Sequence, residues 1–269
     1  MNQIGILYHP QLEKAQDLAN KLKDLLAAEG ISSWQCPAWE EDKAESQVAG
    51  SDLIFSIGGD GTILHAAHIS APFAVPILGI NLGKVGFISE IGVDELLPKL
   101  PDILRSGGWI EERAMLEAQL EDKKFYALND AVLRATTVKL ISIEVDIDGE
   151  VLATYRADGI IIATATGSTA YSLAAGGPVL HPQCREIILQ PISCHLGLAH
   201  TSVLPSQSSV VARIVSNDNA ILSLDGQLNL PISCEQSIMV KLSPYSSRFL
   251  RIGKPTYFYS SLWQKLQRK

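Results

Sequence analysis

The sequence has no uninterrupted apolar run of the roughly 18 residues that a membrane-spanning helix requires. No basic segment precedes its first apolar run, so the pattern of a secretory signal peptide is missing too. Its cysteines are far apart and form no Cys-x-x-Cys pair, which argues against a zinc site and indicates reduced thiols. From these absences we expect a soluble, cytoplasmic protein without a membrane partner. The cysteines are Cys36, Cys184, Cys194 and Cys234.

Positive charge is also scarce. The chain has 22 lysine and arginine residues against 29 aspartate and glutamate residues, which gives a net charge of -7. This balance argues against a broad surface for nucleic acid or for an anionic membrane, so we expect any phosphate to be held locally by backbone donors and a few basic side chains. With 269 residues, 46% of them hydrophobic, the chain can build one large domain or two modest ones.

Three common signatures are absent as well. The sequence has no Gly-x-Gly-x-x-Gly dinucleotide fingerprint and no glycine-rich loop ending in Gly-Lys-Ser or Gly-Lys-Thr. It has no Gly-x-Ser-x-Gly elbow of a serine hydrolase either. If the protein binds a nucleotide, it does so by another arrangement.

The first hundred residues alternate between strand and helix patterns. Short apolar runs at 4–9, 52–57 and 75–80 have the form of buried parallel strands. Apolar residues at helical spacing from Ala15 to Leu26 predict an amphipathic helix, and 61–70 and 93–106 are also predicted to be helical. This rhythm indicates an α/β domain with an open, mostly parallel sheet, whose ligands bind at the carboxyl ends of the strands.

The period changes near residue 107. Residues 141–147 alternate strictly between apolar and polar side chains, and the later runs are short, β-branched and bounded by turns. We therefore predict an N-terminal α/β domain over 1–107 and a C-terminal all-β, sandwich-like domain over 108–246. A helical pattern at 259–269 suggests that the tail, about 247–269, packs back on the first domain.

The stretch GGDGT at residues 58–62 lies between a predicted strand and a predicted helix. Gly58, Gly59 and Gly61 can present backbone N–H groups to a phosphate at the helix start, close to Thr62. Asp60 would repel a phosphate, so the functional interpretation is that its carboxylate acts as a general base on an attacking hydroxyl. The alternative is a tight turn in which Asp60 caps the helix by accepting an N–H near Ile63.

Two further motifs follow strands or interrupt them. Asn81 and Lys84 lie in a glycine-flanked segment directly after the strand ending at residue 80. Taken alone the segment is best explained as an ordinary loop, but its place at a strand's carboxyl end, beside the first loop, favours a site. Asn129 and Asp130 interrupt an apolar run, so at least one of them faces a partly buried environment. The pair suits hydrogen bonding to sugar hydroxyls, and the alternative is a bulge or turn.

The segment 156–178 contains the most specific pattern. Asp158 and a glycine precede an apolar strand, and hydroxyl side chains follow it at a predicted helix start, with Tyr171 available to stack on a flat ring. A purely structural turn seldom collects so many hydroxyl groups. The residues are Thr166, Ser168, Thr169 and Tyr171. Asp225 and Gln227 are weaker site candidates, because a plain hairpin turn explains 224–227.

Taken in order, the four motifs at 58–62, 81–87, 129–130 and 158–178 resemble the NAD kinase family, over about residues 50–230. The resemblance implies phosphoryl transfer from ATP, another nucleoside triphosphate or polyphosphate to the 2′-hydroxyl of the adenosine ribose of NAD, giving NADP. It further implies a divalent metal, an active site in the cleft between an α/β and a β domain, and a homodimer or homotetramer.

By this resemblance Asp60 activates the 2′-hydroxyl, and Gly58, Gly59, Gly61 and Thr62 shape the phosphate loop, with Asp60 and Gly61 also touching NAD. Residues of the later motifs hold the dinucleotide: Asn129, Asp130, Asp158, Thr166, Ser168, Thr169, Ala170 and Tyr171. The sequence departs from the family pattern at several positions. Asp130 stands where glutamate is usual, Ala165 replaces a proline, Ala174 replaces a serine, and His200 replaces an arginine within the divergent segment 191–205.

We expect Mg²⁺ to bind mainly to the phosphates of the nucleotide, because Mg²⁺ seldom occupies an all-protein cage. Lys84 and Arg134 are candidates for additional positive charge. Two alternatives remain from the residues alone. A lipid kinase can share the glycine loop, and a non-catalytic dinucleotide sensor can share the binding motifs, although binding alone does not require Asp60.

Overall fold

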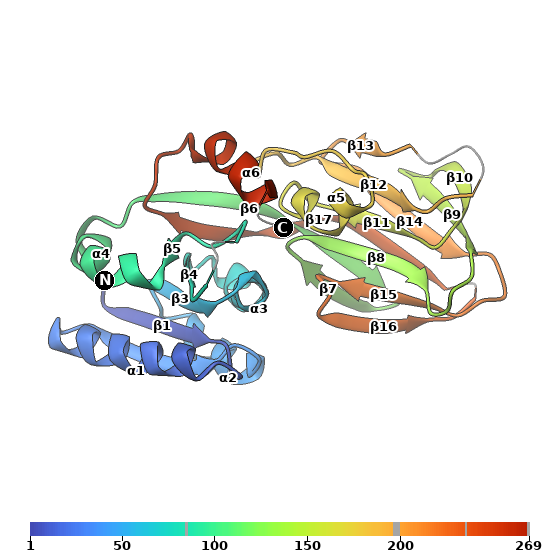
Figure 1. The fold of residues 1–269 in the computed structure, drawn as a ribbon. Helices are drawn as coiled ribbons and strands as arrows, with labels where there is room; N and C mark the ends of the chain where they lie inside the picture. The colour runs from blue at the N-terminus through green and yellow to red at the C-terminus, as the bar shows by residue number, and fades with distance from the viewer. Residues whose placement is uncertain (84–85, 196–199, 235, 268–269) are drawn as a thin grey trace. The chain divides into compact units, whose positions relative to one another are not determined.

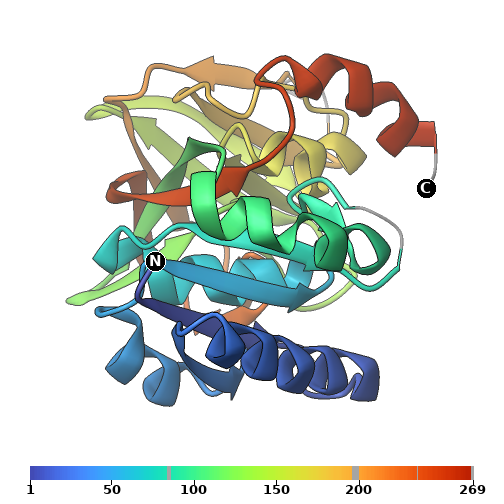
Figure 2. The same ribbon diagram turned by 90° about the vertical axis from the view of Figure 1, so that its left-hand side faces the viewer.

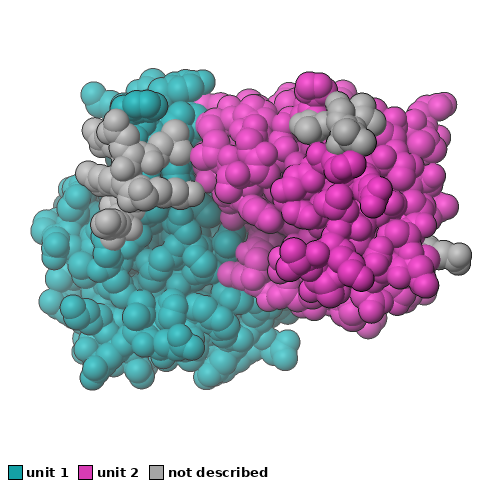
Figure 3. Space-filling model, turned by 45° about the vertical axis from the view of Figure 1, so that its right-hand side comes forward, with its two compact units in different colours: residues 1–112, 246–269 teal, residues 113–245 magenta. Residues whose placement is uncertain are grey.

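The computed structural model describes residues 1–83, 86–195, 200–234 and 236–267. The chain divides into two compact units, shown in different colours in Figure 3. Unit 1 comprises residues 1–112 and 246–269, and unit 2 comprises residues 113–245. The N-terminal α/β and C-terminal β architecture predicted from the sequence is confirmed.

Unit 1 alternates strands and helices along the chain (Figure 1). The expected strands and helices of the first hundred residues are present, and α4 accommodates Pro98 and Pro101 within it. The elements are β1 (Gln3–Tyr8), α1 (Glu13–Ala28), β2 (Ser32–Pro37), α2 (Glu41–Val48), β3 (Leu53–Gly58), α3 (Asp60–Ser70), the 3₁₀ turn η1 (Ala71–Phe73), β4 (Ile77–Asn81), β5 (Ile91–Gly92), α4 (Val93–Ser106) and, at the C-terminus, α6 (Tyr257–Gln267).

The sheet of unit 1 is parallel, with the strand order β2-β1-β3-β4. After β1 the chain crosses to β2 on one side, and after β3 it crosses to β4 on the other. The order therefore reverses between β1 and β3, where the connections after the two strands diverge. In open α/β sheets such a reversal leaves a crevice at the carboxyl ends of the strands. Apolar side chains of α1, α4 and the strands form the core of this unit.

Unit 2 is built from antiparallel strands. Its elements are β7 (Lys123–Ala127), β8 (Asp130–Ala135), β9 (Ile141–Ile147), β10 (Glu150–Ala157), β11 (Gly159–Ala163), η2 (Gly167–Thr169), α5 (Tyr171–Ala174), β12 (Ile187–Ile192), β13 (Ser202–Leu204), β14 (Ser209–Ile214), β15 (Ala220–Leu224) and β16 (Leu228–Ile232). Two long strands, β6 (Trp109–Leu120) and β17 (Ser237–Arg251), carry the chain from unit 1 into unit 2 and back.

One sheet of unit 2 has the order β13-β12-β11-β8-β15-β16. In the other the strands run β10-β9-β14-β17, and β6 pairs with both β17 and β7. Alternate residues of both sheets meet in one apolar core, as Ile143 of β9 and Ile162 of β11 do. This arrangement is the sandwich that the period-2 pattern predicted.

The strand β11 is apolar at every position because both of its faces are buried. Ile160 and Ile162 point into the sandwich core, whereas Ile161 and Ala163 join a second cluster beneath the segment that contains Ala175. The short helical segment η2–α5, predicted from the small residues at 167–177, follows β11 directly.

The C-terminal helix α6, red in Figures 1 and 2, belongs to unit 1. All four cysteines are free thiols. In the described part of the chain, no helix has the length and apolar character needed to cross a membrane.

Candidate functional site

The glycine turn after β3 borders a cavity of about 590 Å³ in unit 1. Its lining residues follow the carboxyl ends of three neighbouring strands, at the place where the sheet order reverses. They are Gln11, Leu12, Glu13 and Lys14 after β1, Gly58 and Gly59 after β3, and Asn81, Leu82 and Gly83 at the end of β4. The two glycines and Asn81, predicted from separate motifs, therefore share one cavity.

Asp60 is the first residue of α3, and its carboxylate does not cap the helix. The N-cap residue is Gly59, with no side-chain cap. The Asp60 carboxylate instead accepts the Phe87 N–H at 2.8 Å and the Ile88 N–H at 3.4 Å. The helix-capping alternative is therefore wrong: the carboxylate is fixed by a distant segment of the chain, and its oxygens retain further lone pairs for another donor.

The position of the Asp60 carboxylate explains a glycine of the neighbouring loop. A Cβ atom at Gly86 would lie 2.1 Å from Asp60 Oδ1, closer than any real contact. Residue 86 must therefore be glycine for the carboxylate to occupy this place.

The cavity of unit 1 can attract an anion although the chain is acidic. The first backbone hydrogen bond of α1 is donated by Ala15 to Leu12 O, so the N–H groups of Glu13 and Lys14 precede the helical ladder. The N-terminus of α3 lies at the same cavity through Gly59. Lys14 forms no ion pair with any residue that the structure describes. Two helix N-termini and one available ammonium group thus converge there.

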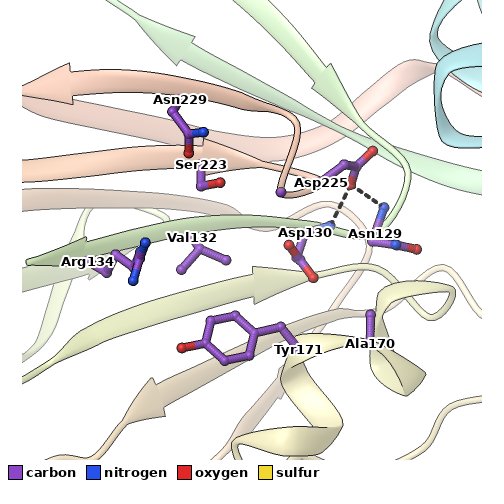
Figure 4. A pocket seen from close by; sticks show the side chains of 10 residues that line it. Asn129, Asp130, Val132, Arg134, Ala170, Tyr171, Ser223, Asp225 and Asn229 are labelled. Atoms are coloured by element: carbon purple, nitrogen blue, oxygen red, sulfur yellow. Dashed lines mark hydrogen bonds between the residues drawn. The ribbon is translucent and has the colours of Figure 1, made fainter. Parts of the chain in front are cut away.

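A second cavity, of about 400 Å³, lies in unit 2 (Figure 4). Its lining residues come from β8 and the residue before it, from β15, β16 and the turn between them, and from the start of α5. They are Asn129, Asp130, Val132, Arg134, Ala170, Tyr171, Ser223, Asp225, Gly226 and Asn229. Strand periodicity explains the set, because Asp130, Val132 and Arg134 are alternate residues on one face of β8.

Asp225 fixes the backbone of the Asn129–Asp130 pair. Its carboxylate accepts the N–H groups of Leu128 at 2.8 Å, Asn129 at 2.7 Å and Asp130 at 3.0 Å. Asp225 and Gly226 have φ values of 52° and 68°, as a tight hairpin turn requires. The hairpin interpretation of 224–227 is therefore confirmed, and the turn places its aspartate where three backbone donors meet. Asp225 also lines the cavity, and its contact with a ligand stays a prediction.

Asp130 is 5% exposed and lies beside Asp225. Burial, and to a smaller degree the negative charge of Asp225, raise the pKa of Asp130 to about 7. Near neutral pH this side chain exists in both protonation states, so it can accept a hydrogen bond or donate one.

The segment 164–171 packs tightly against the same pair. Thr164 donates its hydroxyl to Leu128 O at 2.6 Å and its N–H to Asn129 O at 2.9 Å. A Cβ atom at Gly167 would lie 2.0 Å from Asn129 O, which explains why this position is glycine. The chain then delivers Ala170 and Tyr171 to the cavity.

The structure separates the hydroxyl residues of this segment from the cavity lining. Ser168 is buried, donates to Ala165 O at 2.6 Å and accepts the Leu180 N–H at 3.0 Å. Thr169 is buried and donates to Thr166 O at 3.3 Å. Thr166 is buried as well. These contacts hold the loop, and direct contact of the three hydroxyls with a ligand stays a prediction.

The remaining predicted residues lie apart from one another. Asp158 is exposed at the start of β11, where its backbone meets Ala135, the end of β8 opposite to Asp130. In unit 1, Gly61 is exposed and Thr62 is buried. Gln227 donates its N–H to Leu224 O in the hairpin. Lys84 lies outside the described residues.

Sequence reasoning missed several lining residues. Gln11 and Lys14 could have been found from their place after the first strand of a parallel sheet. Ser223 is a polar residue between two buried leucines of β15, a signal that one face of that strand is not core. No such local signal marked Asn229, whose place depends on the pairing of β15 with β16.

Among the residues that the structure describes, no group of three or more histidine, cysteine, aspartate or glutamate side chains could hold a metal ion.

Comparison with known proteins gives a consistent result. Residues 4–107 match the family described as the ATP-NAD kinase N-terminal domain, and residues 128–252 match the ATP-NAD kinase C-terminal domain. The NAD kinase of Dehalococcoides mccartyi (strain CBDB1) is 43% identical over 271 residues, covering 98% of this chain and 95% of that protein. The NAD kinase of Chloroflexus aurantiacus (strain ATCC 29366 / DSM 635 / J-10-fl) is 35% identical over 274 residues, covering 100% and 99%.

Two solved structures share the fold. Yeast NADH kinase complexed with NADH has a TM-score of 0.86 at 24% identity, covering 99% of this chain and 88% of that chain. An NAD kinase from Archaeoglobus fulgidus in complex with ATP has a TM-score of 0.82 at 24% identity, covering 99% of both chains.

The raised pKa of Asp130 predicts a pH-dependent effect of Asp130→Asn on stability. The ordinary pKa of 3.8 applies to the unfolded chain and a pKa of about 7 to the folded one, so folding stability falls as pH rises between these values. Asparagine avoids this loss. We expect the variant to melt at a higher temperature than the parent at pH 8, and the difference to shrink at pH 5. Each kcal/mol corresponds to roughly 2–4 °C for a domain of this size.

Calorimetric melts of both proteins at the two pH values provide the measurement. Asp122→Asn is the matched control, because Asp122 is an exposed aspartate of the same unit. An Asp130→Asn displacement that is equal at pH 5 and pH 8 would contradict the prediction.

Proposed function

The chain belongs to the ATP-NAD kinase family, whose members phosphorylate NAD, and from this premise we propose how its residues perform the reaction. In the proposed reaction a phosphoryl group passes from ATP to the 2′-hydroxyl of the adenosine ribose of NAD, and the products are NADP and ADP. The observation that carries the assignment of the base is the fixed carboxylate of Asp60, directly after a glycine turn that borders a cavity.

Asp60 accepts the proton of the 2′-hydroxyl. The hydroxyl oxygen forms a bond to the γ-phosphorus as the bond from that phosphorus to the bridging oxygen of ADP breaks. Transfer of this kind proceeds through a loose transition state, so the protein contributes mainly position and charge. The N–H groups of Phe87 and Ile88 keep the carboxylate of Asp60 oriented while it takes up the proton.

The cavity of unit 2 binds the dinucleotide in this proposal. Tyr171 offers a ring that is 42% exposed for stacking, and Asn129 and Asp130 offer hydrogen bonds to ribose hydroxyls. Arg134 is the one basic residue among the described residues of this lining, and its charge suits the diphosphate of NAD. Substitution of the usual family glutamate by Asp130 shortens the side chain by one methylene and keeps both protonation states accessible.

The cavity of unit 1 holds the phosphates of the donor. Gly58 and Gly59 allow backbone N–H groups to approach a phosphate, and the N-terminus of α1 adds a second positive helix end. Lys14 supplies the ammonium group that the glycine loop lacks. A triphosphate and a polyphosphate share this chemistry, so the donor class includes both.

The divalent metal of the proposal, Mg²⁺, is bound by the donor phosphates. Among the described residues no cluster of ligands competes with those phosphate oxygens for the ion. When bound, the ion neutralises part of the negative charge on the phosphoryl group that is transferred.

The proposal also includes a homo-oligomer in the cytoplasm. The edge strands β10 and β13 of unit 2 leave their outer hydrogen-bonding groups without a neighbouring strand in the described sheets. Both edges carry exposed apolar side chains, Val151 and Leu152 on β10 and Val203 on β13. Exposed apolar edges of this kind are suited to pairing with another chain.

The assignment of Asp60 predicts the behaviour of Asp60→Asn. Asparagine can still accept the Phe87 N–H through its oxygen, so the fold and NAD affinity should persist. Loss of a general base lowers turnover by about 10²–10⁴-fold. A coupled assay that detects NADP from NAD, ATP and Mg²⁺ measures turnover, and titration calorimetry measures affinity. Turnover equal to that of the parent would show that Asp60 is not the base.

The assignment of the donor cavity predicts an effect of Lys14→Ala on ATP alone. A hydrogen bond to a charged group contributes about 1.5–3 kcal/mol, so KM for ATP should rise at least about tenfold while KM for NAD changes less than about twofold. Lys21→Ala on the exposed face of the same helix is the control and should leave both constants unchanged. An unchanged KM for ATP in Lys14→Ala would place the donor elsewhere.

The oligomer predicts a molar mass of twice or four times 29.1 kDa in solution. Light scattering during size-exclusion chromatography measures this mass. Introducing charge at one edge by Val151→Glu should lower the mass if that edge pairs, and Val203→Glu tests the other edge. A monomeric mass for the parent chain would refute the proposed assembly.

A further inference from the structure

The segment from Gly86 to Glu90 connects Asp60 to the C-terminal part of unit 1. One side of the segment donates the Phe87 and Ile88 N–H groups to the Asp60 carboxylate. The segment is also tied to itself and to the sheet, because Gly86 donates its N–H to Ser89 Oγ at 2.8 Å and Glu90 donates its N–H to Gly79 O at 2.9 Å. The two donors to the base thus lie in one short segment that is itself held by hydrogen bonds.

Arg251, at the end of β17, also holds this segment, through its carbonyl and carboxylate groups. Its Nη1 donates to Ile88 O at 2.9 Å and to Glu90 Oε2 at 3.1 Å, and its Nε donates to Glu111 Oε2 at 2.7 Å. Ile88 therefore gives its N–H to the carboxylate of Asp60 and receives the guanidinium at its carbonyl oxygen. A single residue transmits the position of Arg251 to the base.

The charges of this network are buried. The side chains of Arg251 and Glu111 are 1% exposed and that of Glu90 is 9% exposed. Burial alone would lower the pKa of Arg251, but the neighbouring carboxylates, Glu111 foremost, raise it, and the guanidinium stays charged. Glu90 Oε1 also accepts the N–H groups of Ile252 and Gly253, at 2.8 and 2.9 Å.

A buried ion pair contributes little net stability relative to apolar residues of similar volume, because the loss of hydration offsets the attraction. What such a pair supplies is a defined geometry, since each charged group has one set of partners. In this chain the ion pair defines the position of the two N–H groups that donate to the Asp60 carboxylate.

We infer that Arg251 and Glu90 are positioning residues for the base of the phosphoryl transfer, acting on Asp60 through the Phe87–Ile88 backbone. This inference rests on the proposed role of Asp60. It assigns a contribution to turnover to the last strand of the fold, far in sequence from the glycine turn. Neither residue touches the reacting atoms; they set the direction of the carboxylate.

The variant Glu90→Gln tests this inference. The amide oxygen can still accept the Ile252 and Gly253 N–H groups, whereas the amide NH₂ faces Arg251 Nη1, donor against donor. The guanidinium then loses one of the two anchors beside Ile88. We expect kcat to fall about tenfold, since small misplacements of a catalytic group carry effects of up to about 10². KM for NAD and for ATP should change by less than about twofold.

The decisive measurement repeats the substitution in the Asp60→Asn background. A residue that acts through the Asp60 carboxylate loses its influence when the carboxylate is absent, so Glu90→Gln should change the residual turnover by less than about twofold. A general structural defect would instead lower turnover by the same factor in both backgrounds, and that result would overturn the inference. If Asp60→Asn alone turned over normally, the proposed base would fail first, which separates the two outcomes.

The matched control is Glu112→Gln. It removes the exposed ion pair between Glu112 and Arg248, which joins the same strands, β6 and β17, without reaching the 86–90 segment. Its kcat should equal that of the parent. If Glu90→Gln melts below the assay temperature, Arg251→Lys takes its place, because it keeps the positive charge but loses the guanidinium group that reaches Ile88 O, Glu90 and Glu111 together. The same loss of effect in the Asp60→Asn background is expected, and equal factors in both backgrounds would again contradict the inference.

Discussion

The hydrogen bonds from Phe87 and Ile88 to the Asp60 carboxylate are the constraint on which the unit 1 site depends. A negative charge in a phosphate loop is unfavourable unless its direction is controlled. Here two backbone donors fix that direction, and Gly86 leaves the space that the carboxylate occupies. In the proposed function the glycine turn serves a phosphate and the same loop carries the base. Lys14 and two helix N-termini lie at the same cavity, and in this proposal they offset part of its negative charge.

Unit 2 uses an aspartate in a related way, with a different result. Asp225 accepts three backbone N–H groups and thereby sets the start of β8. Its negative charge then acts on the buried Asp130, adding to the effect of burial on the pKa of that residue. The Asp225 carboxylate is occupied by backbone N–H groups. Asp130, whose pKa is raised to about 7, can both donate a hydrogen bond to a ligand and accept one. This division of roles suits recognition of sugar hydroxyls, which both donate and accept.

The alternatives raised by the sequence can be weighed against these sites. A lipid kinase would share the glycine loop, but matches to both domains of the ATP-NAD kinase family extend over most of the chain. A dinucleotide sensor would need the unit 2 cavity and would have no use for a carboxylate oriented by a separate segment. The contacts of the 86–90 segment and Arg251 fix the orientation of the Asp60 carboxylate, and this favours an enzyme over a sensor.

Much of this protein was determined by sequence patterns that are local. Alternating strand and helix periods gave the α/β unit, period-2 alternation gave the β unit, and the glycine turn with Asp60 could be recognised because its residues are contiguous. The lining of both cavities by Gly58, Gly59, Asn129, Asp130 and Tyr171 was likewise anticipated from motifs. Only the tertiary structure decided what holds these groups. The partners of Asp60 are 27 and 28 residues away, those of Asp225 about a hundred, and Arg251 lies 163 residues from Ile88. Such contacts depend on strand order and register, which no short-range pattern encodes, because hydrogen bonds and buried charges are satisfied by whichever groups the fold brings together.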